Sequence, residues 1–167
     1  MTNPTQIGVF KNGTPVYVTE DTHLHPEVMD VIGEALQRID ETNLPSFSRQ
    51  AVDMGRIVGR HACVETSAAD DGDIVWARRA NRASYSRFIR NRPAIPTPFI
   101  SITLAKPNDV WLVYTAYFGT PAPKEPTDPR IHDAEREESL VFWKSHALIL
   151  GETGPIDEQT ITTEAKW

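Results

Sequence analysis

Cysteine is nearly absent from this chain, which has one, Cys63, among 167 residues. A single cysteine excludes an internal disulfide framework and any metal site built from several thiolates. It is typical of a protein from a reducing compartment, so we expect a cytoplasmic protein. No apolar run approaches the roughly 20 residues that are needed to span a bilayer. The opening MTNPTQIGVF has neither the basic start nor the apolar core of a secretory signal, and we expect no membrane partner.

The familiar catalytic and cofactor motifs are missing as well. The chain contains no phosphate-binding glycine loop, no Gly-x-Ser-x-Gly and no Cys-x-x-Cys. His23 and His25 lie near Asp21 and Glu27, but none of these residues has the fixed helical spacing of a His-Glu-x-x-His zinc motif. We therefore interpret the two histidines as loop residues and predict neither a metal nor another cofactor. Cys63 lies in a valine-containing stretch, where a cysteine is more often a small buried hydrophobe than a nucleophile.

Acidic residues are absent from 74–108, although the chain as a whole carries a formal charge of -6. Six arginines lie in this stretch, within IVWARRANRASYSRFIRNRP. Net acidity argues against a protein that coats nucleic acid indiscriminately, because such binding depends on phosphate neutralisation by Lys and Arg. It does not exclude a local basic surface, because the distribution of charge matters more than its sum. The stretch therefore predicts a basic surface beside two paired strands.

The first part of the chain predicts a hairpin followed by helices. GVFKNGTPVYV places short apolar runs on both sides of Asn12-Gly13, the pair that favours a tight hairpin turn. Residues 27–41 have apolar positions at helical spacing, and residues 47–54 are compatible with a short second helix. Residues 55–66 then predict one or two short strands, because their glycines favour a bend.

The second part predicts strands with one late helix. Residues 68–73 form an acidic turn, 74–79 a strand, and the arginine-rich residues after it a loop. Residues 99–105 alternate, and 110–118 are rich in β-branched and aromatic types, as expected for a central strand. A helix over 134–143 and a short strand over 146–150 follow. We therefore predict an α+β fold in one domain, residues 1–150, with an N-terminal hairpin and helices packed on a four- or five-stranded antiparallel sheet. Residues 151–167 are predicted to be a polar tail.

The arginine cluster is the strongest candidate for a binding site. Arginine pairs with phosphate through a planar fork and stays charged at any relevant pH. Aromatic residues are interleaved with the arginines, and aromatic rings can stack on exposed bases. The alternative is that the acids of 70–73 or 135–138 neutralise the cluster within the molecule. The residues that we expect to contact nucleic acid are Arg79, Arg87, Phe88, Arg90, Arg92 and Ser101.

A second group of residues could catalyse metal-free RNA cleavage. His61 could deprotonate a ribose 2′-hydroxyl, since a histidine titrates near neutral pH. Arg78 and Arg82 would stabilise the charge that develops on phosphorus. His146 or Tyr114 would act as the general acid. The alternatives are that His61 hydrogen-bonds the backbone at a strand edge and that His146 is packed in the core.

These residues give the chain a resemblance to the barnase–EndoU–colicin–RelE superfamily of metal-independent ribonucleases and to bacterial polymorphic-toxin tails. The resemblance covers about residues 55–150. It implies helices on an antiparallel sheet and active groups drawn from histidine, arginine, serine or threonine, and tyrosine. Ribonuclease toxins are usually basic, whereas this chain is acidic. The positions that match are His61, Arg78/Arg79, the Ser86-Arg87-Phe88 step, Ser101/Thr103, and Tyr114 or Tyr117.

Two hypotheses follow. In the first, the protein binds RNA at 78–92 and cleaves it without metal. In the second, it is a non-enzymatic interaction module whose arginines dock on an acidic protein partner, a hypothesis that net acidity and the proline-rich segment 120–129 favour. A common cleft for His61, His146 and the arginines would favour the first.

Overall fold

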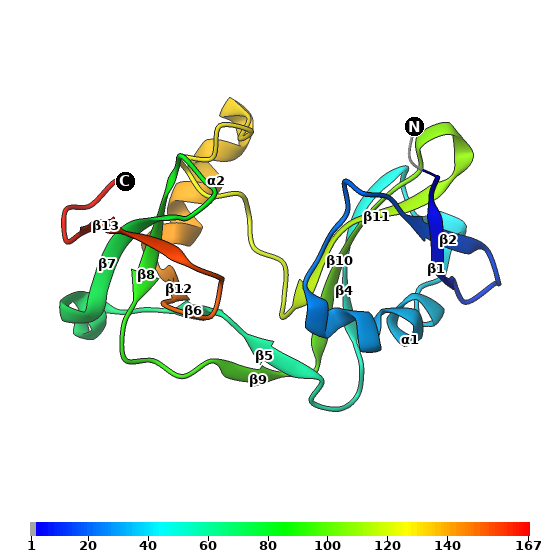
Figure 1. Ribbon diagram of the computed structural model, residues 1–167, viewed down its shortest axis with the longest axis horizontal. Coiled ribbons are helices and arrows are strands. Elements are labelled where there is room, and N and C mark those ends of the chain that lie inside the picture. Colours follow the sequence, from blue (N-terminus) through cyan, green and yellow to red (C-terminus); the bar gives the residue numbers. More distant parts are fainter. Residues whose placement is uncertain (1–2) are drawn as a thin grey trace. The chain divides into compact units, whose positions relative to one another are not determined.

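A computed structural model describes residues 3–167 as a mainly-β α+β protein with three sheets and few helices (Figure 1). The α+β class is therefore confirmed. Within the described residues the chain forms two compact units. The first runs to Arg60 and resumes over Pro96–Pro121, and the second comprises His61–Ile95 and Ala122–Trp167. Each unit therefore draws on two stretches that are separate in the sequence.

The first unit is built around a six-stranded mixed sheet. Its main path has the order β1-β2-β11-β10-β4, and β3 pairs with β11. The predicted hairpin is confirmed, since β1 and β2 are antiparallel neighbours and Gly13 takes the positive φ of 91° that its turn requires. The strands are β1 (Thr5–Val9), β2 (Pro15–Val18), β3 (His23–Leu24), β4 (Phe47–Asp53), β10 (Phe99–Ala105) and β11 (Trp111–Phe118).

The helix predicted over 27–41 is broken into three pieces. They are a 3-10 turn at Pro26–Asp30, the helix α1 at Ile32–Gln37 and a second 3-10 turn at Glu41–Asn43. Val31 interrupts the run, because its φ and ψ of -121° and -9° are not helical. The predicted apolar face is nevertheless buried in the core of this unit, together with residues from the sheet. A third 3-10 turn, Pro107–Asp109, joins β10 to β11.

The prediction of a short helix over 47–54 is wrong, because this segment forms the edge strand β4. Seven consecutive residues of β4 pair antiparallel with β10. Ser48 and Val52 alternate with exposed Phe47 and Arg49, which is the period of a strand. The pairing with a strand about fifty residues away decided the conformation, and local propensity did not reveal it.

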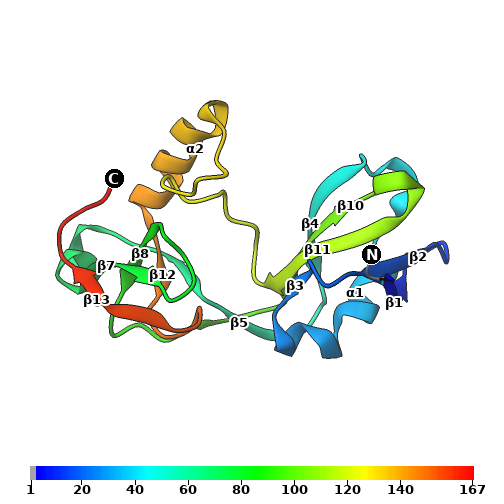
Figure 2. The same ribbon diagram turned by 45° about the horizontal axis from the view of Figure 1, so that its top comes forward.

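The second unit contains a five-stranded mixed sheet of order β13-β7-β8-β12-β6. Strands β7 and β8 are antiparallel, whereas β8 and β12 are parallel. Helix α2 (Asp133–Lys144) packs on one face through Trp143, and β13 lies beside β7 at the edge (Figures 1 and 2). The strands are β6 (Cys63–Glu65), β7 (Ile74–Arg79), β8 (Tyr85–Ile89), β12 (His146–Ile149) and β13 (Ile156–Thr162). A 3-10 turn, Ala68–Asp73, precedes β7.

Three expectations are corrected here. The sheets are mixed, not antiparallel, because β11 runs parallel to β2 and β12 parallel to β8. The arginine-rich segment is a β7–β8 hairpin with its turn over 80–84, not a loop. The polar tail contains β13, which pairs with β7.

A separate two-stranded sheet pairs β5 (Gly59–His61) with β9 (Ile95–Thr97).

Candidate functional site

The β7–β8 hairpin distributes its arginines over two faces of the five-stranded sheet. Trp76 pairs with Arg87, and Arg78 pairs with Tyr85. Successive side chains of a strand point to opposite faces, so these four residues share one face, which we call the outer face. The other face, which we call the α2 face, carries Val75, Ala77 and Phe88, and these pack with Trp143 of α2.

Two cations on the outer face lie against the ring of Tyr85. The Arg78 guanidinium carbon lies 5.2 Å from the centroid of the Tyr85 ring, and the Lys166 Nζ lies 4.6 Å from it. Both distances are within the range of a cation–π interaction. Within residues 3–167 neither cation forms an ion pair with a carboxylate. Both positive charges therefore lie over the Tyr85 ring and remain available to an anionic ligand.

Arg87 is the buried cation of the outer face, with 8% of its surface exposed. Its Nη1 donates hydrogen bonds to Thr66 Oγ1 at 2.8 Å and to the His146 carbonyl oxygen at 2.9 Å. Burial lowers the pKa of Arg87, and the Asp71 carboxylate acts in the opposite direction. An arginine remains charged despite such shifts, so the sheet holds a fixed positive charge here.

A hollow of about 460 Å³ opens beside Arg87. It lies between the outer face, the end of α2 and the segment after β13. Trp76 and Trp167 meet there edge to face, with ring centroids 4.4 Å apart. The hollow thus combines two indoles, two cations and one carboxylate; its lining includes Asp71, Trp76, Arg87, Lys144, Thr163 and Trp167.

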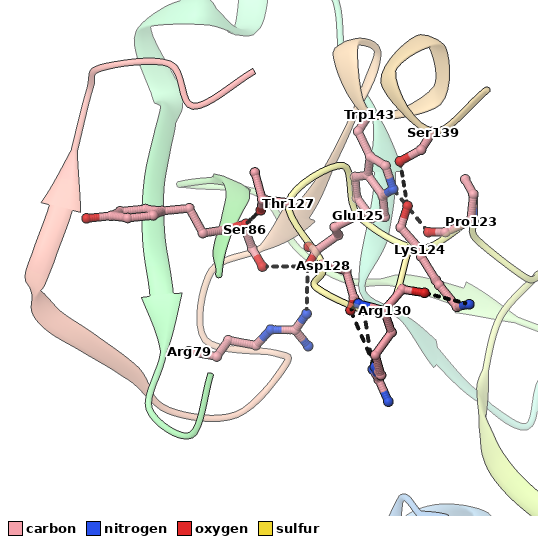
Figure 3. Close-up of polar contacts among 11 residues, drawn as sticks. Arg79, Ser86, Pro123, Lys124, Glu125, Thr127, Asp128, Arg130, Ser139 and Trp143 are labelled. Atoms are coloured by element: carbon pink, nitrogen blue, oxygen red, sulfur yellow. Dashed lines mark hydrogen bonds and ion pairs between the residues drawn. The ribbon is translucent and has the colours of Figure 1, made fainter. Parts of the chain in front are cut away.

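Two of the six arginines are neutralised within the unit. On the α2 face, Arg79 Nη2 lies 3.1 Å from Glu125 Oε2, and Ser86 Oγ donates to the same oxygen at 2.9 Å (Figure 3). Arg92 pairs with Asp70 of the acidic turn at 3.5 Å. The predicted neutralisation by the acidic turn therefore holds for Arg92. Arg79 instead pairs with a carboxylate from the proline-rich segment, which the sequence did not point to.

The remaining two arginines lie at opposite ends of β8. Arg82 is exposed in the hairpin turn and lies among the charges of Arg79, Glu125 and Asp128. Arg90 is exposed just after β8, and its backbone N–H donates to the Asp73 carbonyl oxygen. The six arginines therefore do not form one contiguous clamp.

The two candidate histidines are near one another but not near Arg78. His146 stacks on Phe142 of α2, with ring centroids 3.8 Å apart, and its Nδ1 is 2.9 Å from the Phe142 carbonyl oxygen. Its imidazole therefore lies on the α2 side, whereas the Arg78 side chain lies on the outer face. Burial lowers the pKa of His61, and the proximity of His146 lowers it further. Among the described residues no hydrogen bond joins the two imidazoles.

Three other predicted site residues have different surroundings. Phe88 is fully buried in the core beneath α2, so its ring faces protein and not a ligand. Ser101 is buried in the first unit and donates to the Gly119 carbonyl oxygen at 2.6 Å. Tyr114, also in the first unit, is 37% exposed. The predicted set is thus divided between the two units and, within the second, between two faces.

Sequence reasoning missed Trp76, Lys144, Glu125, Lys166 and Trp167 as site residues. Trp76 occupies a strand whose alternation could have placed it beside the arginines. The other four become neighbours of the hairpin only through pairings across 39 residues or more, for which the sequence carries no local signal.

No group of three or more His, Cys, Asp or Glu side chains within residues 3–167 is placed to hold a metal ion. Cys63 is buried, and burial with the nearby Glu125 charge raises its pKa to about 12, so the thiol is not a nucleophile at neutral pH. In the part of the chain that the structure describes, no helix has the length and apolar character that crossing a membrane requires.

Among known proteins, the chain shows a similarity of fold and none of sequence family. No protein-family model matches the chain, and no curated protein matches its sequence. Among solved structures it is similar to a conserved hypothetical protein from Toxoplasma gondii ME49, a crystal structure at 2.35 Å. The TM-score is 0.51 and the identity 14%, over 81% of this chain and 96% of that one. At this identity the likeness shows the fold alone.

Proposed function

We propose that the second unit binds single-stranded RNA on its outer face. The observation that carries this proposal is that Arg78, Lys166 and Arg87 form no ion pair among the described residues, whereas Arg79 and Arg92 do. Unpaired cations beside aromatic rings are the features that a single strand requires, because phosphates need positive charge and unstacked bases need π-faces.

The proposal covers RNA binding only and does not include RNA cleavage by the residues that the sequence predicted to be catalytic. A general base must lie within hydrogen-bond reach of the proton it removes, while an arginine contacts the same phosphate. The His146 imidazole lies on the α2 side of the sheet, and Arg78 lies on the outer face. This separation removes the geometric support for a His–Arg cleavage centre around Arg78.

Neutralising two outer-face cations is expected to weaken RNA binding. Each phosphate contact to a single strand contributes about 0.7 to the slope of log K against log salt, so one lost contact lowers affinity about fivefold at 0.1 M salt. We expect Arg78→Gln and Lys166→Gln each to show this loss, and the double variant about 25-fold. Fluorescence anisotropy with a labelled oligoribonucleotide measures it, and the matching DNA strand reports whether the 2′-hydroxyl matters.

A matched control is Arg136→Gln, because Arg136 is an exposed arginine of α2 that pairs with Asp133 at 3.5 Å. It removes one positive charge from the same unit but leaves the outer face intact. An equal loss in Arg136→Gln, or full affinity in the double variant, would contradict the proposal. Wild-type protein that binds no oligonucleotide, but retains an acidic protein partner through Arg78, would favour the interaction-module hypothesis instead.

A further inference from the structure

The hollow beside Arg87 contains a cation whose direction is fixed before any ligand arrives. Arg87 is more than nine-tenths buried, and its Nη1 is held by Thr66 Oγ1 and the His146 carbonyl oxygen. These two bonds fix the plane of the guanidinium. Its Nε and Nη2 make no hydrogen bond with any described residue. A guanidinium that is buried, oriented and only partly used is suited to a bidentate contact with phosphate.

A second cation lines the same hollow. Lys144 is the last residue of α2 and is exposed, and it forms no ion pair within residues 3–167. Arg87 and Lys144 therefore face the hollow from two different elements, the sheet and the helix. Two cations without a paired carboxylate favour a ligand with more than one negative oxygen, as a phosphate has.

The remaining lining suits a nucleobase. Trp167 lines the hollow and is only partly buried, so its indole offers a surface for stacking. Asp71 is exposed at the rim and can accept hydrogen bonds from the N–H groups of a base. Asp70, beside it, is already engaged by Arg92 and by the backbone N–H of Ser67. The volume of about 460 Å³ falls in the range of about 300–1,000 Å³ that small-ligand pockets occupy.

From this geometry we infer that the hollow binds one nucleotide of the RNA, with its phosphate between Arg87 and Lys144, its base against Trp167 and base N–H groups at Asp71. The inference rests on the proposed RNA binding and assigns a nucleotide subsite to it. A free nucleoside monophosphate presents the same chemistry, and competition with RNA distinguishes the two sources.

The test is titration of the full chain with each of the four ribonucleoside 5′-monophosphates, followed by the indole Nε1–H signals of its four tryptophans. We expect the Trp76 and Trp167 signals to shift and that of Trp111, in the first unit, to stay. Lys144→Gln should weaken binding about fivefold at 0.1 M salt, and Trp167→Ala more strongly. Arg136→Gln, which loses a positive charge elsewhere on α2, should change nothing.

Asp71→Asn is expected to strengthen the binding of phosphate, whereas the variants above weaken the binding of nucleotides. It removes a negative charge from the rim, so inorganic phosphate should bind more tightly, while the monophosphates should lose the advantage that their bases give. Because Asp71 is exposed, this variant should fold as the wild type does.

The outcomes separate this inference from the RNA proposal. Nucleotide binding that an oligoribonucleotide displaces supports the subsite. Nucleotide binding that RNA does not displace would overturn its assignment to the RNA surface. No nucleotide binding, with RNA binding intact, would overturn the subsite and leave the RNA proposal standing. A wild-type protein that does not bind the oligoribonucleotide would overturn the proposed function, whether or not it binds nucleotides.

Discussion

Replacing Glu125 by alanine is expected to lower the free energy of unfolding of the second unit by about 3–5 kcal/mol, the usual cost of removing one partner of a buried ion pair. Glu125 is 6% exposed, and its Oε2 accepts from both Arg79 and Ser86. The variant would leave the Arg79 charge, whose side chain is 20% exposed, without its carboxylate. It would also leave the buried Ser86 hydroxyl without an acceptor.

Urea unfolding followed by tryptophan fluorescence measures this effect, because three of the four tryptophans, at 76, 143 and 167, lie in the second unit. Glu138→Gln is the matched control, since Glu138 is exposed on α2. The double variant Arg79→Met/Glu125→Leu should recover the part of the loss that the uncompensated Arg79 charge causes, because an apolar pair of similar volume often replaces a buried ion pair without cost. The Ser86 hydroxyl still lacks its acceptor in this variant. A Glu125→Ala protein as stable as the control would show that Glu125 does not hold the proline-rich segment to the sheet.

Phe88→Ala is expected to destabilise the second unit by a similar amount, about 3–5 kcal/mol, through the cavity it leaves. Phe88 has no exposed surface and packs with Val75, Trp143 and Leu148. Cys63 belongs to the same cluster and is buried, so its reaction with a thiol reagent reports opening of this core. Labelling through opening should accelerate more than a hundredfold, because about 1.4 kcal/mol corresponds to a factor of ten.

The controls for this prediction separate packing from base stacking. Phe88→Leu should keep most of the stability and all of the RNA affinity, because the ring faces the core. Phe47→Ala should leave the labelling rate unchanged, since Phe47 is 57% exposed and lies in the first unit. A Phe88→Leu variant that folds normally but loses RNA binding would restore Phe88 to the ligand-contacting residues.

The elements that the sequence predicted are those whose signals are local. Asn12-Gly13 specified the first hairpin, and the alternation of 99–105 specified β10, because turn chemistry and period-two patterning act over a few residues. The pairing of β4 with β10 could not be predicted in this way, because a partner about fifty residues away decided it.

The site was predictable only in part, for a related reason. The concentration of arginines drew attention to the β7–β8 hairpin, on which the proposed binding surface lies. The sequence does not say which arginines are neutralised, because their partners are remote: Arg79 meets a carboxylate 46 residues away. Ser86 and Arg87 are polar, yet both are buried on β8. They are buried because Glu125, Thr66 and the His146 carbonyl satisfy their hydrogen bonds.

The salt dependence of RNA binding tests the central claim most directly. If Arg78, Lys166 and Arg87 contact phosphates of a single strand, log K should fall with log salt at a slope of about -2, and Arg78→Gln should reduce the magnitude of that slope by about 0.7. An affinity that is independent of salt, or an Arg78→Gln slope equal to that of the wild type, would contradict the assignment of the outer face as an RNA-binding surface.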